Sequence, residues 1–207
     1  MKSLYILLVA IAVCTVSCRT KEGAPGPSGE STLTQQGTIS GSLAYVDYQG
    51  NPISVPFSYS YFASLAGNKF SYDENGKKNY LVQLFRRDLK DNNNYIGFYN
   101  LLGYNVNNQF NAPSSGDFDF SLVKIINNNL FEFNAYFYST NTTTLSTYTI
   151  TNYNLNATTG RLTFDFEIVF DPNSIDDSVR YNYEVVAIVT GKVDVILNRT
   201  PLYSVSQ

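Results

Sequence analysis

Paired carboxylates are the residues of this chain best suited to acid–base chemistry. Asp165 and Glu167 stand two residues apart in a segment of alternating polar and apolar residues, and Asp117 and Asp119 repeat that spacing. On a strand, residues two apart share a face and lie about 7 Å from each other, a separation at which two carboxylates can hydrolyse a glycosidic bond. The same pattern is typical of the wet face of a half-exposed strand. The polar neighbours favour the second interpretation, so we assign no catalytic residue.

A loop rich in oxygen ligands offers a second kind of chemistry. Asp171, Asn173, Asp176 and Asp177 lie within seven residues, and carboxylate and amide oxygens are the ligands that Ca²⁺ prefers. Their spacing does not match an EF-hand loop, and Asp, Asn and Pro are also ordinary turn residues. These four residues are therefore a candidate Ca²⁺ site that fits a plain turn equally well. We expect no other metal site and no cofactor.

Much other chemistry is excluded by composition. Histidine is absent, which removes Ser-His-Asp and Cys-His catalysis and every histidine-ligated metal site. Both cysteines lie within the first eighteen residues, so a chain cut before Cys18 retains one thiol and forms no internal disulfide. The chain contains no Gly-x-Ser-x-Gly elbow, P-loop or Gly-x-Gly-x-x-Gly motif. We therefore expect a protein that is not an enzyme.

The N-terminus carries an export signal. Lys2 precedes the apolar run 4–13, which is followed by Thr15-Val16-Ser17-Cys18 and then by a polar, Gly/Pro-rich segment. The apolar run is about half the roughly 20 residues that a bilayer-spanning helix needs, as in a secretory signal peptide. With a small residue, Ser17, directly before Cys18, the segment resembles the lipoprotein signal peptides of Bacteroidota-type bacteria.

The resemblance implies that Cys18 becomes the lipidated N-terminus, with a diacylglyceryl group on sulfur and an acyl group on its amine. Thr15 stands where the strict pattern prefers Leu, which suits the looser form of the motif. Two or more acyl chains anchor a protein stably in a membrane. The implied location is the cell envelope, with the lipid anchor in the outer membrane and the protein on the periplasmic face or the cell surface. The alternative is an ordinary secretory signal in which Cys18 stays unmodified.

Composition also limits the partners. Removing residues 1–17 deletes Lys2 and no acidic residue, so the formal charge changes from −3 to −4. This acidity argues against a nucleic-acid partner, which would need a basic stripe. Asp177-Ser178-Val179 resembles the O-glycosylation acceptor of Bacteroidota-type envelopes and makes Ser178 a candidate for a glycan.

The many tyrosines suit a surface that binds a glycan or an envelope protein, and they equally suit the core of a β domain. Tryptophan, the usual anchor of a sugar platform, is absent. The candidates for such a face are Tyr45, Tyr48, Tyr59, Tyr61, Tyr95, Tyr99, Tyr136, Tyr138, Tyr148, Tyr153, Tyr181 and Tyr183.

The elements that position these residues are strands, because apolar residues recur with period two and no window shows a helical period. The clearest hairpins join 118–126 to 130–138 around Asn127–Asn129, and 148–155 to 161–170 around 156–160. Other strands are expected at 38–48, 53–64, 79–87, 95–106 and 181–197, with Gly191 as a possible bulge. The alternation in the last hairpin places five side chains inside: Leu162, Phe164, Phe166, Ile168 and Phe170.

The sequence therefore predicts an all-β protein with a single antiparallel β-sandwich of about nine to eleven strands. A calycin-like β-barrel is the alternative, because alternation does not reveal closure. We expect a signal peptide at 1–17, a lipidated cysteine and flexible tether at 18–37, and the β domain at 38–207. The expected function is a lipid-anchored binding or structural module; the alternatives are a carboxylate-based glycan hydrolase and a barrel that carries an apolar ligand.

Overall fold

The protein is all-β, as the sequence predicts. The computed structural model describes residues 34–46, 50–62, 67–72, 79–106, 109–126, 129–138, 146–175 and 186–201. These residues contain strands and the short 3₁₀ turn Pro172–Ser174, but no α-helix. The strands are β1 (Thr34–Val46), β2 (Pro52–Phe62), β3 (Asn68–Tyr72), β4 (Asn79–Arg87), β5 (Tyr95–Val106), β6 (Gln109–Phe110), β7 (Ser115–Ile126), β8 (Asn129–Phe137), β9 (Thr147–Leu155), β10 (Arg161–Phe170), β11 (Ala187–Ile196) and β12 (Asn198–Pro201).

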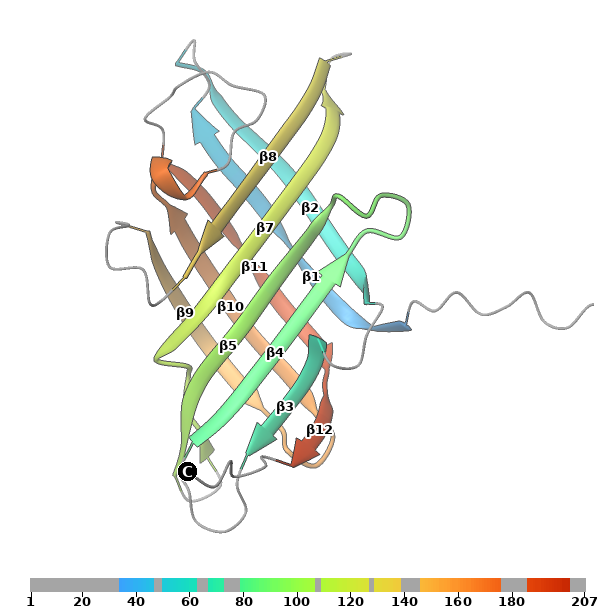
Figure 1. Ribbon diagram of the computed structural model, residues 1–207, viewed down its shortest axis with the longest axis vertical. Helices are drawn as coiled ribbons and strands as arrows, with labels where there is room; N and C mark the ends of the chain where they lie inside the picture. Colours follow the sequence, from blue (N-terminus) through green and yellow to red (C-terminus); the bar gives the residue numbers. More distant parts are fainter. Residues whose placement is uncertain are drawn as a thin grey trace, which may run out of the picture. The chain divides into compact units, whose positions relative to one another are not determined.

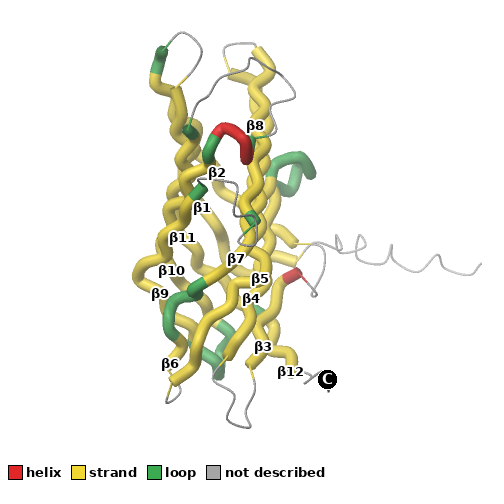
Figure 2. The backbone as a smooth tube through the Cα atoms, turned by 60° about the vertical axis from the view of Figure 1, so that its left-hand side comes forward, coloured by secondary structure: helices red, strands yellow, loops and turns green. Residues whose placement is uncertain are grey.

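All of these strands belong to a single sheet. Its main order is β8-β7-β5-β4-β2-β1-β11-β10-β9, and every pair along this path is antiparallel. Three short strands lie off the path: β6 pairs with β5, and β3 pairs with β4 on one side and in parallel with β12 on the other. The sheet curls so that β8, β7, β5 and β4 stand in front of β1, β11, β10 and β9 (Figures 1 and 2).

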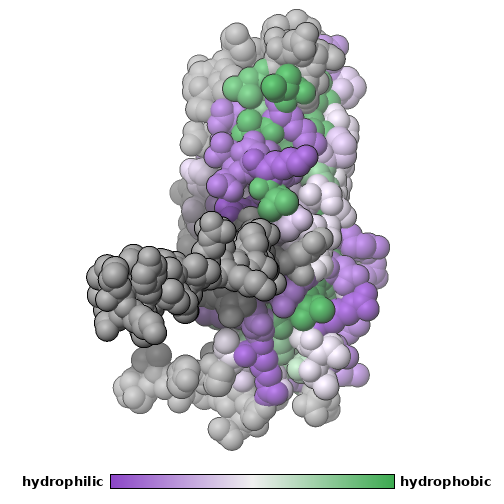
Figure 3. Space-filling model, turned by 90° about the vertical axis from the view of Figure 1, so that its right-hand side faces the viewer, coloured by the Kyte–Doolittle hydropathy of each residue, from purple (hydrophilic) through white to green (hydrophobic). Residues whose placement is uncertain are grey.

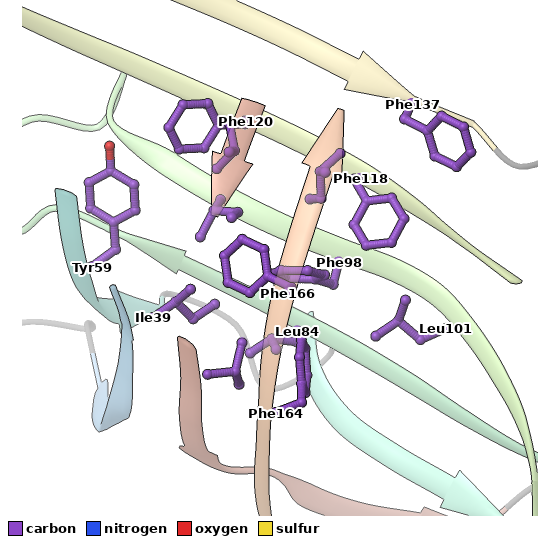
Figure 4. Close-up of a cluster of buried hydrophobic side chains, with 14 of the residues drawn as sticks. Ile39, Tyr59, Leu84, Phe98, Leu101, Phe118, Phe120, Phe137, Phe164 and Phe166 are labelled. Carbon is purple, nitrogen blue, oxygen red and sulfur yellow. The ribbon is translucent and has the colours of Figure 1, made fainter. Parts of the chain in front are cut away.

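The core lies between the two halves of the curled sheet. Phe98 of β5 lies 5.1 Å, centroid to centroid, from Phe166 and 5.4 Å from Phe164 of β10, and Phe57 of β2 lies 5.1 Å from Phe120 of β7. These are contact distances for aromatic rings, so side chains fill the interior at these places (Figure 4). The two layers of the predicted sandwich are thus the two halves of one continuous sheet.

The ends of the sheet, β8 and β9, are joined by side chains. Tyr148 of β9 lies 4.7 Å from the ring of Phe118 and 5.9 Å from that of Phe137. Ile175, beyond the end of β10, forms one isolated bridge with Ala135 of β8. Among the described residues no backbone pairing links β8 to β9, so the sheet is curled like half of a barrel rather than closed.

Burial follows the predicted alternation. Leu162, Phe164, Phe166, Ile168 and Phe170 are all buried, while Thr163, Asp165 and Glu167 between them are not. This confirms the interior face of β10. On the face of the molecule drawn in Figure 3, hydrophobic residues stand among hydrophilic ones, as expected for strands that bury one face only.

A buried arginine lies where the pairing of β4 changes. β4 pairs with β2 at its last residue, Arg87, and with β3 over residues 80–84. Arg86 is fully buried, and its Nη atoms donate to the carbonyl of Gln36 at 2.8 Å and to Oδ1 of Asn68 at 2.6 Å. Asn68 in turn donates to the carbonyl of Ile196. The Arg86 guanidinium also lies 4.7 Å from the ring centre of Phe62. The guanidinium thus satisfies one backbone carbonyl and one side-chain amide oxygen in the interior.

Several details differ from the sequence-based expectation. β1 begins at Thr34, inside the segment predicted as tether, because Thr34 pairs with Phe62 of β2 beyond a register shift. Asn129 belongs to β8 and pairs with Ile126, so it is not part of the turn. β11 has a regular register through Gly191, so Gly191 is not a bulge.

Gly191 is required for a different reason. A Cβ atom at this position would lie 2.4 Å from the carbonyl oxygen of Ser40 and 2.7 Å from the ring of Phe166. The glycine therefore lets the Phe166 ring and β1 approach the backbone of β11.

The chain divides into two units, Met1–Thr32 and Leu33–Gln207. The first unit contains the predicted signal peptide and Cys18 and lies outside the described residues.

Candidate functional site

The carboxylate pair of β10 belongs to a hydrogen-bonded outer face. Oδ2 of Asp165 accepts a hydrogen bond from Asn152 at 2.6 Å, and its Oδ1 lies 3.4 Å from Nζ of Lys192. The Asn152 hydrogen bond, with a smaller contribution from Lys192, lowers the pKa of Asp165. A general acid needs a raised pKa, so Asp165 is poorly suited to donate a proton. Glu167 is exposed on the same strand.

Asp171 of the candidate Ca²⁺ loop acts as a helix cap. Its Oδ1 accepts a hydrogen bond from the backbone N–H of Asn173 at 2.6 Å, at the start of the 3₁₀ turn. Its own N–H donates to Oγ of Ser146. Asp176, Asp177 and Ser178 lie outside the described residues. Within the part of the chain that the structure describes, no group of three or more acidic, cysteine or histidine side chains could hold a metal.

The structure brings four of the candidate tyrosines together on the outer face of β4, β5, β7 and β8. We call this cluster the tyrosine face; it consists of Phe85, Tyr95, Tyr99, Asp119, Tyr136 and Tyr138. Alternation explains its side of the sheet, because the intervening Ile96 and Phe98 of β5 and Phe118 and Phe120 of β7 are buried in the core.

Strand register places Asp119 near the middle of the tyrosine face. Asp119 pairs with Gly97 of β5 on one side and with Tyr136 of β8 on the other. Gly97 also pairs with Phe85 of β4, which completes a row across four strands. Tyr95 and Tyr99 flank Gly97 two residues before and after it. The cluster therefore depends on the pairing of segments that are distant in sequence.

Gly97 makes room for the ring of Tyr99. A Cβ atom at position 97 would lie 2.5 Å from the nearest ring carbon of Tyr99 and 2.6 Å from its hydroxyl. The Tyr99 ring therefore lies over the backbone of its own strand, next to the residue that pairs with Asp119. From the other side of Gly97, the Tyr95 hydroxyl donates to Oδ1 of Asp119 at 3.4 Å. The Tyr95 ring is supported by Phe85, at 5.4 Å between centroids.

The pKa shifts of Asp119, Tyr95 and Tyr99 show that these three side chains are partly desolvated and close together. Burial raises the pKa of Asp119, and hydrogen bonds from Tyr95 and the Phe120 backbone only partly oppose this effect. Burial, followed by the negative charge of Asp119, raises the pKa of Tyr95 and of Tyr99 to about 12. Both tyrosines therefore stay protonated near neutral pH and remain hydrogen-bond donors.

The outer part of the tyrosine face is open to solvent. Tyr136 is 38% exposed and Tyr138 is 49% exposed, and their rings lie 5.5 Å apart. By contrast, Tyr59 and Tyr80 are buried in the core, and the ring of Tyr153 packs at 5.9 Å against Phe164. The face thus offers two exposed rings beside a half-buried carboxylate with phenolic donors.

A concave feature lies elsewhere, between β3, β12 and the β9–β10 turn. It is a hollow of about 510 Å³ lined by Phe70, Tyr72, Ala157, Thr158, Thr159, Gly160, Ile196, Leu197, Asn198 and Arg199. The Arg199 guanidinium lies 4.7 Å from the ring centre of Tyr72, and the Tyr72 ring meets Phe110 edge-on at 5.3 Å. The ring of Tyr72 is thus occupied by neighbours within the protein, which makes the hollow a weaker candidate than the tyrosine face.

The sequence provided the tyrosines and the aspartate of the tyrosine face, but neither Phe85 nor their grouping. Tyr95, Tyr99, Tyr136 and Tyr138 are among twelve candidate tyrosines, and Asp119 is one of several outward carboxylates. The signal that could have identified the site is the alternation Tyr95-x-Gly97-x-Tyr99 aligned with Asp119, which requires the β5–β7 register.

Comparisons with known proteins give no relative that would suggest a role for the tyrosine face. None of the described helical segments is long and apolar enough to cross a membrane. No family model, curated protein or solved structure matches this chain.

Proposed function

We propose that this protein is a lipid-anchored binding module of the cell envelope that holds a glycan on its tyrosine face. The observation that carries the proposal is the convergence of Tyr95, Tyr99 and exposed tyrosine rings on the half-buried carboxylate of Asp119. The anchor would be the lipidated Cys18 in the outer membrane, as the resemblance of the N-terminus implies.

The chemistry of the face suits a sugar. The C–H side of a sugar ring packs on a tyrosine ring, which has an apolar body and a polar edge. Sugar hydroxyls donate to a carboxylate and accept from phenols. β5 and β8 are two strand spacings apart, about 10 Å, so a ligand that spans Tyr95 and Tyr136 is longer than one sugar ring. An extended glycan would reach across this row of neighbouring strands.

Two other functions are less well supported. An apolar-ligand carrier needs an internal cavity, whereas the Phe98, Phe164 and Phe166 rings fill the interior where they meet. A glycan hydrolase needs a general acid and a second carboxylate in a cleft. Asp165 has a lowered pKa, and Asp119 lies on the outer face of a sheet.

Binding to glycans tests the proposal. The full chain, purified in detergent, is titrated with a panel of bacterial, plant and host polysaccharides. We expect at least one to bind and Tyr136→Ala to weaken binding several-fold, since an aromatic contact contributes about 0.5–1.5 kcal/mol beyond its buried area. Tyr104→Ala is the matched control, because Tyr104 is an exposed tyrosine of β5 roughly 15 Å along the strand from Tyr99.

Three results would contradict the proposal. If no polysaccharide binds, the ligand is not a glycan. If the protein instead captures an envelope protein in a way that depends on Tyr136, the ligand is a protein. Release of reducing ends that stops in Asp119→Asn would replace binding with hydrolysis.

A further inference from the structure

Two outward carboxylates of β10 and β11, Asp165 and Asp194, each lie beside a cation. On the half formed by β10 and β11, Asp194 lies 2.8 Å from a guanidinium nitrogen of Arg161, and Asp165 lies 3.4 Å from Nζ of Lys192. Lys192 is the cross-strand partner of Asp165. These acids therefore have cations on neighbouring strands, which is the usual arrangement of an exposed sheet face.

Asp119 has no such cation. Its cross-strand partners are Gly97 and Tyr136, and its side chain accepts a hydrogen bond from the neutral hydroxyl of Tyr95. Glu132 of β8 likewise accepts from the amide of Asn134 at 3.2 Å. Within the described ranges, neither carboxylate forms an ion pair with a lysine or arginine.

Other charged groups near the tyrosine face have separate partners. Arg87 of β4 pairs with Tyr95, but its guanidinium donates to Oδ1 of Asn92 at 2.7 Å. Asp117, two residues before Asp119, accepts from Asn100 at 2.9 Å. Among the six residues that make up the tyrosine face, Asp119 is therefore the charged one, and its charge is negative.

We infer that the ligand presents a positively charged amine to Asp119, so that the glycan bound on the tyrosine face is an amino sugar polymer. This inference rests on the proposed glycan-binding function and narrows its ligand. An ammonium group donates to a carboxylate in a charge-assisted hydrogen bond, and the faces of tyrosine rings attract cations. The site thus supplies a carboxylate for the ammonium group and tyrosine rings for the sugar. A neutral glycan would contact the rings but would form no ion pair with the carboxylate.

A matched pair of ligands tests the inference. Titration of the full chain in detergent compares chitotetraose, whose glucosamine units carry free amines, with its fully N-acetylated form, which has the same backbone without the charge. We expect chitotetraose to bind at least about tenfold more tightly, because a hydrogen bond to a charged group contributes about 1.5–3 kcal/mol, or about tenfold or more in affinity. Asp119→Asn should remove this difference, and added salt should reduce it.

Glu167→Gln is the control variant, because it removes the same charge from the exposed face of β10. It should keep the preference for the free amine. Equal binding of both tetrasaccharides, or binding only of other polysaccharides in the panel, would overturn the amine inference while leaving glycan binding intact. A preference lost equally in Asp119→Asn and Glu167→Gln would show that net charge, not this site, selects the amine, and would also overturn it. Failure of every glycan to bind would instead overturn the proposed function itself.

Discussion

At the scale of single residues, Asp119 is a group whose charge opposes folding. Burial raises its pKa, so the folded chain holds the proton more tightly than the unfolded chain does. The contribution of Asp119 to the free energy of unfolding is therefore greatest below the ordinary pKa of an unfolded aspartate. It falls as the pH rises through the raised pKa of the folded chain. A residue that lowers stability in this way is typical of a binding site.

The variant Asp119→Asn removes the charge and keeps the shape. We expect it to be more stable than the wild type at about pH 7 and to lose this advantage towards about pH 2.5, where the carboxyl is protonated in both states. Urea melts at the two pH values measure the difference. A variant less stable than the wild type at neutral pH would show that the Tyr95 hydrogen bond outweighs the desolvation of the charge.

Phe166 tests the core at the same scale. Its ring is buried, lies 5.1 Å from that of Phe98 and packs over Gly191. We expect Phe166→Ala to lower the free energy of unfolding by about 3–5 kcal/mol, because it leaves a cavity between the two halves of the sheet. Thr163→Ala, on the outer face of the same strand, should cost under about 0.5 kcal/mol. Small and equal effects in denaturant melts would contradict the packing of β10.

At the scale of elements, Arg86 stabilises the part of β4 where its strand partner changes from β2 to β3. Burial lowers the pKa of this guanidinium to about 10, a value at which it remains charged near neutral pH. Its hydrogen bonds to Gln36 and Asn68 hold β1 and β3 against β4. The arginine thus links strands where the regular ladder between β2 and β4 is reduced to the single pair Tyr61–Arg87.

Replacing Arg86 should be costly even though it removes a buried charge. Arg86→Leu leaves the Gln36 carbonyl and the Asn68 side chain without their donor, and each unsatisfied buried group costs about 1–3 kcal/mol. We expect a loss of at least about 2 kcal/mol in urea melts. The matched control is Arg87→Leu, the next residue, whose exposed contact with Asn92 should contribute less than about 1 kcal/mol. Equal losses would mean that Arg86 does not connect the strands.

The sequence predicted long elements better than short or irregular ones. β7, β8 and β10 were predictable because each buries one face over nine or more residues. β3 and β12 were missed because they are short, and their parallel pairing arises from contacts distant in sequence. Two register shifts were also missed, where Asn100 and Asn152 adopt positive φ angles of 52° and 53°. Each asparagine donates to an aspartate on the neighbouring strand, a cross-strand contact that alternation does not reveal.

At the scale of the whole molecule, the candidate site was less predictable than the fold. Period-two alternation gives the side of a sheet to which Tyr99 or Asp119 points, but not which strands are neighbours. The pairing of β5 with β7 and of β7 with β8 places Asp119 between Gly97 and Tyr136. A function that depends on several strands therefore becomes visible only when the whole sheet is assembled.

The anchor also concerns the whole molecule, because it would fix the β domain to a membrane. The N-terminal order of Lys2, an apolar run and Ser17-Cys18 predicts lipidation at Cys18. Each buried CH₂ contributes about 0.8 kcal/mol, so several acyl chains hold a protein on a membrane that it would otherwise leave. We expect Cys18→Ala to release the protein into the soluble fraction or to block cleavage of its signal peptide, as followed by fractionation and by the mass of the chain.

Cys14→Ala is the matched control, because Cys14 lies in the same short segment but is followed by Thr15-Val16-Ser17 rather than by a polar tether. It should be cleaved, lipidated and membrane-bound like the wild type. If Cys18→Ala is cleaved normally and remains as firmly bound to membranes as the wild type, Cys18 is not the anchor. If instead the two cysteines exchange these behaviours, the lipid lies on Cys14, and the mature chain begins four residues earlier, with Cys18 as a second thiol in its tether.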